Sequence, residues 1–312
     1  MPPAHQSTAA VATDRVCLAL DVGGSSVKGA VVDAGGRCWC ADERRLNASA
    51  PAEVVITELA AALDRLYRCS TGELVGVAMA VPGPFDEERG RFLIEGLPKF
   101  EKMYGLELVP LLEEELPWLE GMRVAFLNDA AAFALGEVHH GAGVGSSRVL
   151  AITLGTGCGS AFVVDGKIVT SGAGVPANGH VYDLPFGTGT VDESLSSRGL
   201  ARLWRDSRAV NDDCEPDAAT LAELARSGDQ DALSTYQRFG TNLALALGPT
   251  IKAFAPDVVV LGGNLTRAFD LFGGRAVATL RAGGVSARLE PAQDLAGAPL
   301  KGVATLLLGA GR

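Results

Sequence analysis

The 312-residue sequence has little of several features that mark whole classes of protein. Basic residues are in the minority, with 27 Lys and Arg against 37 Asp and Glu, so the formal net charge is −10. This balance argues against nucleic acid or an anionic membrane as a main partner. No apolar run reaches transmembrane length, and residues 1–14 are small and polar, without the apolar core of a signal peptide. We therefore expect a disordered tail at 1–14 on a cytoplasmic protein.

Cysteine pairing motifs are also missing from the sequence. The six cysteines are scattered and none forms a Cys-x-x-Cys pair, so neither a zinc knuckle nor a redox dithiol is indicated. Cys38 and Cys40 lie two residues apart on an expected strand, where both side chains would point the same way, and we interpret them as small core residues. Hydrophobic residues make up 47% of the chain, and a globular protein of this length and composition has room for two domains.

Two Gly-rich stretches of the sequence match one another without a gap. Both LALDVGGSSVKGAVVD, at 18–33, and LAITLGTGCGSAFVVD, at 150–165, have the pattern of a strand, a turn and a returning strand. The duplication predicts two halves of one design with a phosphate between them, because Gly turns let successive backbone N–H groups approach an anion. The alternative is two ordinary hairpins with Gly-rich turns.

Elsewhere, strand and helix patterns alternate along the chain. In the first half, a helix that Ser49 could cap follows three strands, and further elements are expected at 74–81, 106–116, 124–127 and 130–139. In the second half, helices are expected near 193–206, 218–227 and 231–254, then a strand at 258–261 and a helix at 300–308. Gly240 and Gly248-Pro249 should bend or break the third of these helices. The order predicts strand-first α/β domains with mixed sheets.

Five motifs in a fixed order give the chain a resemblance to a known family. The first Gly-rich stretch looks like one phosphate loop, VAMAVPGPFD like a Pro-Gly turn on the sugar side, and FLNDAAAFALGE like a catalytic segment. The second Gly-rich stretch looks like another phosphate loop, and VVVLGGN like a Gly-Gly turn on the nucleotide side. Together the motifs resemble the ROK family of bacterial sugar kinases, in the actin/hexokinase/Hsp70-like ATPase superfamily.

The resemblance implies two RNase-H-like α/β domains with mixed sheets and a cleft between them. It implies an N-terminal sugar-kinase domain over 15–127, joined again by 299–312, and a C-terminal nucleotide-binding domain over 128–298. It also implies ATP and Mg²⁺ as cofactors, a sugar acceptor and a homodimer. The expected nucleotide-binding residues are Asp21, Gly23, Gly24, Ser25, Ser26, Lys28, Gly155, Thr156, Gly157, Gly262 and Gly263.

Asn128 and Asp129 stand where an expected strand meets the next helix. A sugar hydroxyl is a poor nucleophile, and a carboxylate within hydrogen-bond reach can accept its proton as a phosphoryl group arrives. Asp129 suits that role and matches the family's catalytic base, while Asn128 can bind a neighbouring hydroxyl. The alternative for the pair is a helix N-cap.

Asp21 follows an apolar strand and faces the first Gly turn. A carboxylate there would orient water around Mg²⁺ on the nucleotide phosphates, and the alternative is an Asp that only stabilises the turn. Lys28 could reach a phosphate or could be a solvated strand residue.

The sugar side departs from the family pattern. Family kinases usually carry Glu-x-Gly-His, but Ala177 stands where that Glu is expected, three residues before His180. The Cys-rich zinc motif of many members has no counterpart at 186–191, so no structural zinc is expected. The Asn that precedes Leu-Pro in the family is Gly96 here. The substrate-binding residues implied by the resemblance are Gly83, Asn128, His180 and Glu193.

Glu193 has an open alternative, because a Glu in the first turn of a helix is also favoured by the helix dipole. The functional hypotheses are a hexose kinase of glucokinase type and a degenerate ROK protein that binds sugar or nucleotide without turnover. Ala177 favours the second hypothesis and Asp129 the first. A ROK regulator would need a DNA-binding helix-turn-helix, for which the residues before the first strand are too few.

Overall fold

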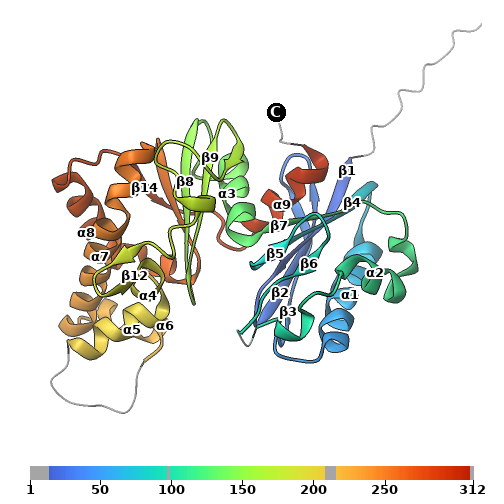
Figure 1. The fold of residues 1–312 in the computed structure, drawn as a ribbon, viewed down its shortest axis with the longest axis horizontal. Helices are drawn as coiled ribbons and strands as arrows, with labels where there is room; N and C mark the ends of the chain where they lie inside the picture. The colour runs from blue at the N-terminus through green and yellow to red at the C-terminus, as the bar shows by residue number, and fades with distance from the viewer. Residues whose placement is uncertain (1–13, 97–98, 208–215, 310–312) are drawn as a thin grey trace, which may run out of the picture.

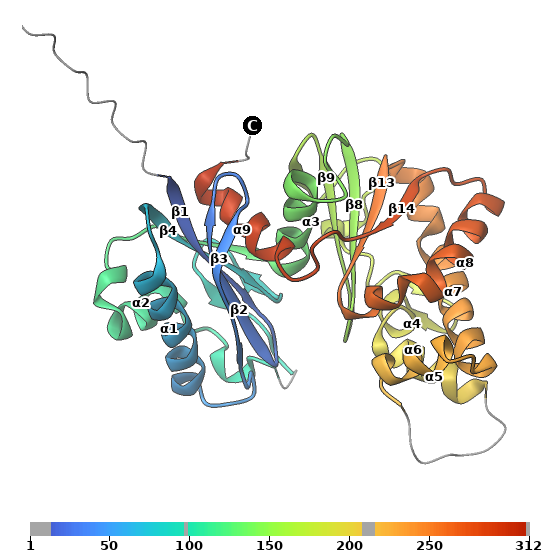
Figure 2. The ribbon, with the colours of Figure 1, turned by 180° about the vertical axis from the view of Figure 1, so that it is seen from behind.

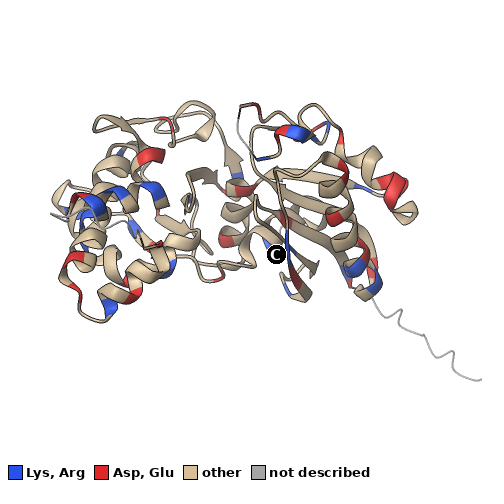
Figure 3. Ribbon diagram, turned by 90° about the horizontal axis from the view of Figure 1, so that it is seen from below, with Lys and Arg blue, Asp and Glu red and all other residues tan. Residues whose placement is uncertain are grey.

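A computed structural model describes residues 14–96, 99–207 and 216–309, which form two α/β halves (Figure 1). Most of the expected tail lies outside these residues. Asp14, its last residue, is described, and its carbonyl oxygen accepts a hydrogen bond of 3.1 Å from the Glu73 N–H. None of the described helices is both long and apolar enough to span a membrane. Basic and acidic residues are both scattered over the two halves (Figure 3).

The first half is built on a five-stranded mixed sheet with the order β3-β2-β1-β4-β7. Its strands are β1 (Arg15–Val22), β2 (Ser26–Asp33), β3 (Cys38–Arg45), β4 (Glu73–Val81) and β7 (Val124–Asn128). Strands β1 to β3 are antiparallel neighbours, while β4 lies parallel to β1 and β7 parallel to β4. A small hairpin of β5 (Phe85–Asp86) and β6 (Arg91–Phe92) follows β4.

Helices cover both faces of this sheet. Alternate residues of β1 and β4 pack against α1 (Ala52–Cys69) and α2 (Leu108–Glu115), and the residues between them pack against α9 (Ala298–Leu308) (Figure 2). Residues 16–20 of β1 are therefore all fully buried. A strand covered on both faces needs a continuous apolar run, which explains the sequence VCLAL. Two short 3₁₀ turns, η1 (Glu101–Met103) and η2 (Pro117–Leu119), complete this half.

The second half repeats the strand order of the first as β10-β9-β8-β13-β14. Its strands are β8 (Arg148–Leu154), β9 (Cys158–Val164), β10 (Lys167–Val169), β13 (Val258–Gly262) and β14 (Arg288–Pro291). One face packs against α3 (Asp129–His140). The other packs against α5 (Ser197–Asp206), α6 (Ala218–Arg226), α7 (Gln230–Phe254) and α8 (Phe269–Ala282). Since β8 and β9 correspond to β1 and β2, the two-domain mixed α/β fold predicted from the repeated stretch is confirmed.

Short turns, a small hairpin and a single helical turn connect the main strands and helices of the second half. These are the 3₁₀ turns η3 (Ala177–Gly179) and η4 (Asn264–Ala268), the hairpin of β11 (Pro185–Phe186) and β12 (Gly189–Thr190), and the single helical turn α4 (Val191–Ser194). The helix expected near 193–206 is thus two helices. The predicted domain boundaries stay predictions, although α9 does pack on the first sheet and α3 on the second.

Two local predictions are wrong. Helix α1 begins after Pro51, which makes no side-chain cap, so Ser49 does not cap it. Helix α7 continues over 25 residues with Pro249 inside it, so neither Gly240 nor Gly248-Pro249 breaks it. Gly240 serves a close helix contact instead, because an added Cβ would meet the Phe272 backbone of α8. Helix α8 and strand β14 had no sequence prediction.

The prediction that Cys38 and Cys40 share a face is also wrong. The pairing of β2 with β3 shifts register beside Cys40, whose φ is 55°. The shift places Cys38 on the α9 face of the sheet and Cys40 on the α1 face. Cys40 forms a disulfide bond with Cys69, the last residue of α1, rather than a core contact alone.

The two halves meet through α3 and α9, which lie between the two sheets (Figures 1 and 2). The helices approach so closely that an added Cβ on Gly136 would meet the Ala298 backbone, and one on Gly302 would meet the Ala132 backbone. A backbone atom cannot turn aside as a flexible side chain can. Both positions therefore require glycine for packing, although each lies inside a helix, where glycine lowers intrinsic helix stability.

We predict that Gly302→Ala lowers the free energy of unfolding by about 2 kcal/mol or more, because the new methyl group overpacks the crossing of α3 and α9. Urea denaturation measures the change. The matched control is Gly274→Ala in α8, where an added Cβ meets nothing within 4 Å. The control should be neutral or gain up to about 1 kcal/mol from helix propensity. Equal effects of the two substitutions would contradict the packing account.

Candidate functional site

The predicted residues of the first half gather at one edge of its sheet. In the parallel pairs, Asp21 of β1 lies opposite Ala80 of β4, and Val81 of β4 lies opposite Asn128 of β7. The carboxyl ends of the three strands therefore coincide, and ligands of α/β sheets bind at such ends. Gly83, just beyond β4, faces Asn128, since an added Cβ would lie 3.5 Å from the Asn128 Nδ2.

The first Gly turn lies at the same edge, between β1 and β2. The Gly23 N–H donates to the Ser26 carbonyl oxygen at 2.9 Å and closes the turn. The carbonyl oxygens of Gly24 and Ser25 accept hydrogen bonds from the Ala48 and Leu46 N–H groups at 3.2 and 3.0 Å. The segment after β3 therefore holds the turn in a fixed shape, as an anion-binding loop requires.

The second Gly turn lies at the equivalent edge of the second sheet. There Thr153 of β8 lies opposite Gly262 of β13. Gly263 has φ of 79° and packs so closely that an added Cβ would meet the Leu154 backbone, directly before Gly155. The structure thus brings the predicted Gly-Gly turn to the predicted residues Gly155, Thr156 and Gly157.

Asn128, not Asp129, is the N-cap of α3. The Asn128 Oδ1 accepts hydrogen bonds from the Ala130 and Ala131 N–H groups at 3.0 and 3.3 Å. The Asn128 N–H donates to the Glu87 carboxylate at 2.8 Å, a contact that sequence reasoning missed. The N-cap alternative therefore applies to Asn128 and leaves Asp129, the first residue of the helix, free of that role.

Asp129 keeps contact with solvent, but the protein around it raises the pKa of its carboxyl group by desolvation. The Ala130 N–H, the Asn128 side chain and the charge of Lys99 each lower that pKa in part. A carboxylate with a raised pKa is a stronger base while still ionised near neutral pH. The environment of Asp129 therefore suits proton acceptance.

Lys99 is a second residue that sequence reasoning missed. Its aliphatic stem lies over Gly24, where an added Cβ would be 2.8 Å from both Cδ and Cε. The next residue, Phe100, is fully buried, and its N–H donates to the Ala48 carbonyl oxygen at 2.7 Å. Phe100 thus anchors the backbone next to Lys99, whose stem lies over the first Gly turn and whose charge acts on Asp129. The only sequence signal was a Lys close to Gly96, where the chain already departs from the family pattern.

Asp21 and Lys28 face one another across the β1–β2 hairpin, with the Lys28 Nζ 4.0 Å from the Asp21 Oδ2. The pKa of Asp21 is raised to about 6, mainly by burial. The charge of Lys28 lowers this pKa in part, while the charges of Asp129 and Glu43 also raise it. Carboxylate oxygens suit Mg²⁺, and a cation would relieve the repulsion between Asp21 and Asp129. The residues present therefore fit a magnesium ion held by Asp21 through water.

Among the predicted substrate-binding residues, His180 is held in position by β9. The buried Ser160 hydroxyl donates to the Gly179 carbonyl oxygen at 2.7 Å and accepts from the Val181 N–H at 3.0 Å. The two bonds clamp the chain on both sides of His180, which is half-buried with its ring 5.0 Å from the Tyr182 ring. Ala177 is exposed at the start of the same segment.

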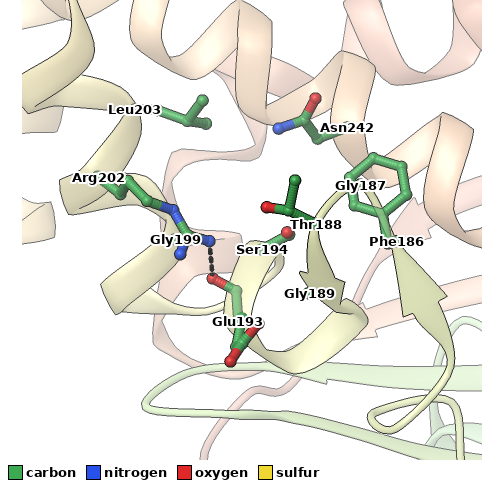
Figure 4. Close-up of a pocket in the computed structure, with 10 residues that line it drawn as sticks. All are labelled: Phe186, Gly187, Thr188, Gly189, Glu193, Ser194, Gly199, Arg202, Leu203 and Asn242. Carbon is green, nitrogen blue, oxygen red and sulfur yellow. Dashed lines mark hydrogen bonds between the residues drawn. The ribbon is translucent and has the colours of Figure 1, made fainter.

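Glu193 lies in the first turn of α4, which is the structural alternative given for it in the sequence analysis. It forms a capping box with Thr190, in which the Thr190 N–H donates to the Glu193 Oε2 at 3.0 Å and the Thr190 Oγ1 accepts from the Glu193 N–H at 3.3 Å. Beside it lies a pocket of about 260 Å³ (Figure 4), where the Arg202 guanidinium donates to the Glu193 carbonyl oxygen at 2.6 Å. The lining residues are Phe186, Gly187, Thr188, Gly189, Glu193, Ser194, Gly199, Arg202, Leu203 and Asn242.

Some predicted residues are not brought together. Among the described residues, no hydrogen bond or ion pair links His180 or Glu193 to Asp129. No group of three or more His, Cys, Asp or Glu side chains in the described ranges is placed to hold a metal ion. Asp21 and Asn128 therefore lie at the edge of the first sheet, the second Gly turn and Gly262 lie at the edge of the second, and α3 lies between the sheets (Figure 1).

The chain is similar to known proteins both in sequence and in fold. The model of the ROK family matches residues 17–309. A glucokinase of Thermotoga maritima is 29% identical over 276 residues, covering 82% of this chain and 84% of that protein. An N-acetylgalactosamine kinase of Shewanella is 28% identical, covering 83% of this chain and 85% of that protein. A Streptomyces griseus ROK family glucokinase, solved with glucose and AMPPNP, superimposes with a TM-score of 0.77 at 24% identity, covering 94% of this chain and 99% of that one.

We predict that Asp21→Asn stabilises the fold at about pH 8 and not at about pH 4. Because the pKa of Asp21 is raised from 3.8 to about 6, ionising this group above pH 6 costs the folded state roughly 2–3 kcal/mol. The stability difference should shrink as the pH falls through 6 and vanish near 4, where Asp21 is already protonated in the folded protein. Thermal unfolding across this range measures it, with Asp64→Asn at a surface ion pair of α1 as control. A gain that does not change with pH would contradict the raised pKa.

Proposed function

Because the chain belongs to the ROK family, we propose that it is an ATP-dependent kinase that phosphorylates a hydroxyl group of a hexose or a related carbohydrate. The observation that carries the proposal is the placement of Asp129 at the sheet edge that also holds the first Gly turn and Asp21. Relatives named as kinases of glucose and of N-acetylgalactosamine support a sugar acceptor. The neighbour solved with AMPPNP supports ATP as the donor.

In this proposal Asp129 is the general base. Its carboxylate accepts the proton of the acceptor hydroxyl as the oxygen attacks the terminal phosphoryl group of the nucleotide. The Asn128 amide is the residue that holds a neighbouring hydroxyl, and Gly83, which faces it, leaves room for the sugar ring. The charge of Lys99 lowers the pKa of Asp129 in part and so favours the ionised form, which is the form that accepts a proton.

The two Gly turns and the Gly262-Gly263 turn hold the nucleotide phosphates through backbone N–H groups. Lys28 sits beside them, paired with Asp21. Mg²⁺ held by Asp21 through water would neutralise phosphate charge. A structural zinc is not part of the proposal, because the segment at 186–191 has no cysteine. We also propose that the working form is a cytoplasmic homodimer, as family kinases often are.

The alternative is a degenerate ROK protein that binds sugar or nucleotide without turnover. Ala177 favours it, because this position lacks the carboxylate of the family pattern. Asp129 opposes it, because its surroundings raise the pKa of its carboxyl group while the Ala130 N–H, the Asn128 side chain and Lys99 favour its ionised form. A protein without chemistry to perform has no need of such a base.

We predict that Asp129→Asn lowers kcat by at least ~10²-fold with little loss of sugar affinity, because the amide keeps the size and hydrogen bonding of the carboxylate but takes no proton. Steady-state kinetics give kcat and calorimetric titration gives the sugar affinity. A variant that turns over at nearly the natural rate would remove Asp129 from the role of base.

We predict that glucose is a poor acceptor and that Ala177→Glu improves it. A charged hydrogen bond from Glu to a ring hydroxyl contributes roughly 1.5–3 kcal/mol, and each 1.4 kcal/mol corresponds to about tenfold in affinity. The natural protein should therefore have a high KM for glucose, and the variant a KM about tenfold to a hundredfold lower. A sub-millimolar KM in the natural protein together with no gain in Ala177→Glu would contradict this view of the acceptor pocket.

A further inference from the structure

Asp192 links the second Gly turn to a charged side chain that no sequence motif pointed to. The Asp192 Oδ1 accepts a hydrogen bond of 2.7 Å from the Cys158 N–H, at the end of the turn. It also lies so close to Gly157 that an added Cβ there would be 2.7 Å away. The other oxygen, Oδ2, accepts from the Arg198 guanidinium at 2.7 Å. One carboxylate thus separates Arg198 from the turn.

The position of Arg198 is fixed by its neighbour in the chain. Ser197, the first residue of α5, donates both its N–H and its hydroxyl to the Gly155 carbonyl oxygen, at 2.8 and 2.9 Å. The second Gly turn and the start of α5 are therefore one rigid unit. The Arg198 side chain remains 67% exposed, whereas Asp192 is 26% exposed. The guanidinium is held by Asp192 and is still open to a ligand.

The negative charge of Asp192 is unexpected beside a turn that is proposed to bind an anion. The Cys158 N–H is one of the turn's donors, and Asp192 already occupies it. A polyphosphate that approaches the turn meets the negative charge of Asp192 at short range, where the repulsion costs binding free energy. Arg198 cancels that charge, and its planar guanidinium has further N–H groups that can bind phosphate oxygens in pairs.

We propose that Arg198 is a phosphate-binding residue of the nucleotide site and that Asp192 holds it beside the second Gly turn. This inference rests on the proposed function in taking a nucleoside triphosphate as the ligand and the second Gly turn as a part of its site. Asp192 acts as a positioning residue, because it fixes the guanidinium and the turn together. When Arg198 is absent, the uncompensated negative charge of Asp192 weakens nucleotide binding.

The test is calorimetric titration of AMPPNP with Mg²⁺ into the full-length protein and four variants. The variants are Arg198→Met, Asp192→Asn, the double substitution, and Arg275→Met as the control. Arg275 is exposed on α8 and loses the same charge from a different helix. Adenosine, which has no phosphate, is titrated into the same proteins to detect any effect on the fold of the site.

Arg198→Met should weaken AMPPNP binding by at least about tenfold, equal to about 1.4 kcal/mol. Asp192→Asn keeps an acceptor for the Cys158 N–H, and the loss of its negative charge offsets its weaker hold on Arg198, so alone it should change the affinity by less than about threefold. In the double substitution at least half of the lost free energy should return, since the uncompensated charge is gone. Arg275→Met, and adenosine with every variant, should bind as in the natural protein.

The proposal is overturned if Arg198→Met binds AMPPNP within twofold of the natural protein, or if Arg275→Met loses as much. It is also overturned if adenosine loses as much affinity as AMPPNP, or if the double substitution restores nothing. A natural protein that does not bind AMPPNP at all would instead remove the proposed function, and this inference with it. Retained AMPPNP binding separates the two failures.

Discussion

The close contact of α3 with α9 is the constraint on which the rest of the structure depends. Each helix lies on the sheet of a different half, so their contact fixes the two halves together. The contact needs glycine on both sides, because backbone atoms of one helix fill the space where a side chain of the other would lie. Asp129 is the first residue of α3, and its position is therefore set by the same packing. The candidate base belongs to the joint between the halves and not to a surface loop.

A shared electrostatic pattern runs through the candidate site. Three carboxylates of the candidate site each have a cation acting on them: the Lys28 Nζ lies 4.0 Å from Asp21, Arg198 binds Asp192, and the charge of Lys99 lowers the pKa of Asp129. A site lined with unpaired carboxylates would repel a polyphosphate, whereas unpaired cations would hold its products tightly. In the proposed function these cations offset the carboxylate charges and lie near the bound phosphates. Desolvation raises the pKa of Asp21 and Asp129 in spite of these partners.

The sequence predicted what depends on local pattern. The repeated stretches predicted two equivalent hairpins, because a Gly turn between two apolar strands can be recognised from a short piece of a single sequence. The register of the parallel strands then brought Asp21, Gly83 and Asn128 to one edge, as the strand ends suggested. The prediction failed where a distant contact decides the outcome. Gly240 looked like a helix breaker and is instead the point where α7 meets α8.

The site residues that sequence reasoning missed share the same cause. Lys99 and Asp192 carry no motif, and their importance comes from what faces them, namely Asp129 and the Cys158 N–H. Cys40 was taken for a core residue because strand periodicity was assumed, but a register shift turned it toward Cys69. Glu193 fitted both a family spacing and a first-turn position favoured by the helix dipole, and only the structure shows that its side chain completes a capping box with Thr190.

The central claim is that this chain transfers a phosphoryl group from ATP to a sugar hydroxyl. The most direct measurement is a coupled assay of ADP release with Mg²⁺-ATP over a panel of hexoses and amino sugars. The account predicts that at least one sugar raises ADP release well above the rate without sugar, and that glucose is not the best of the panel. ADP release that no sugar increases, from a folded protein that still binds AMPPNP, would contradict the claim and leave a binding protein without turnover.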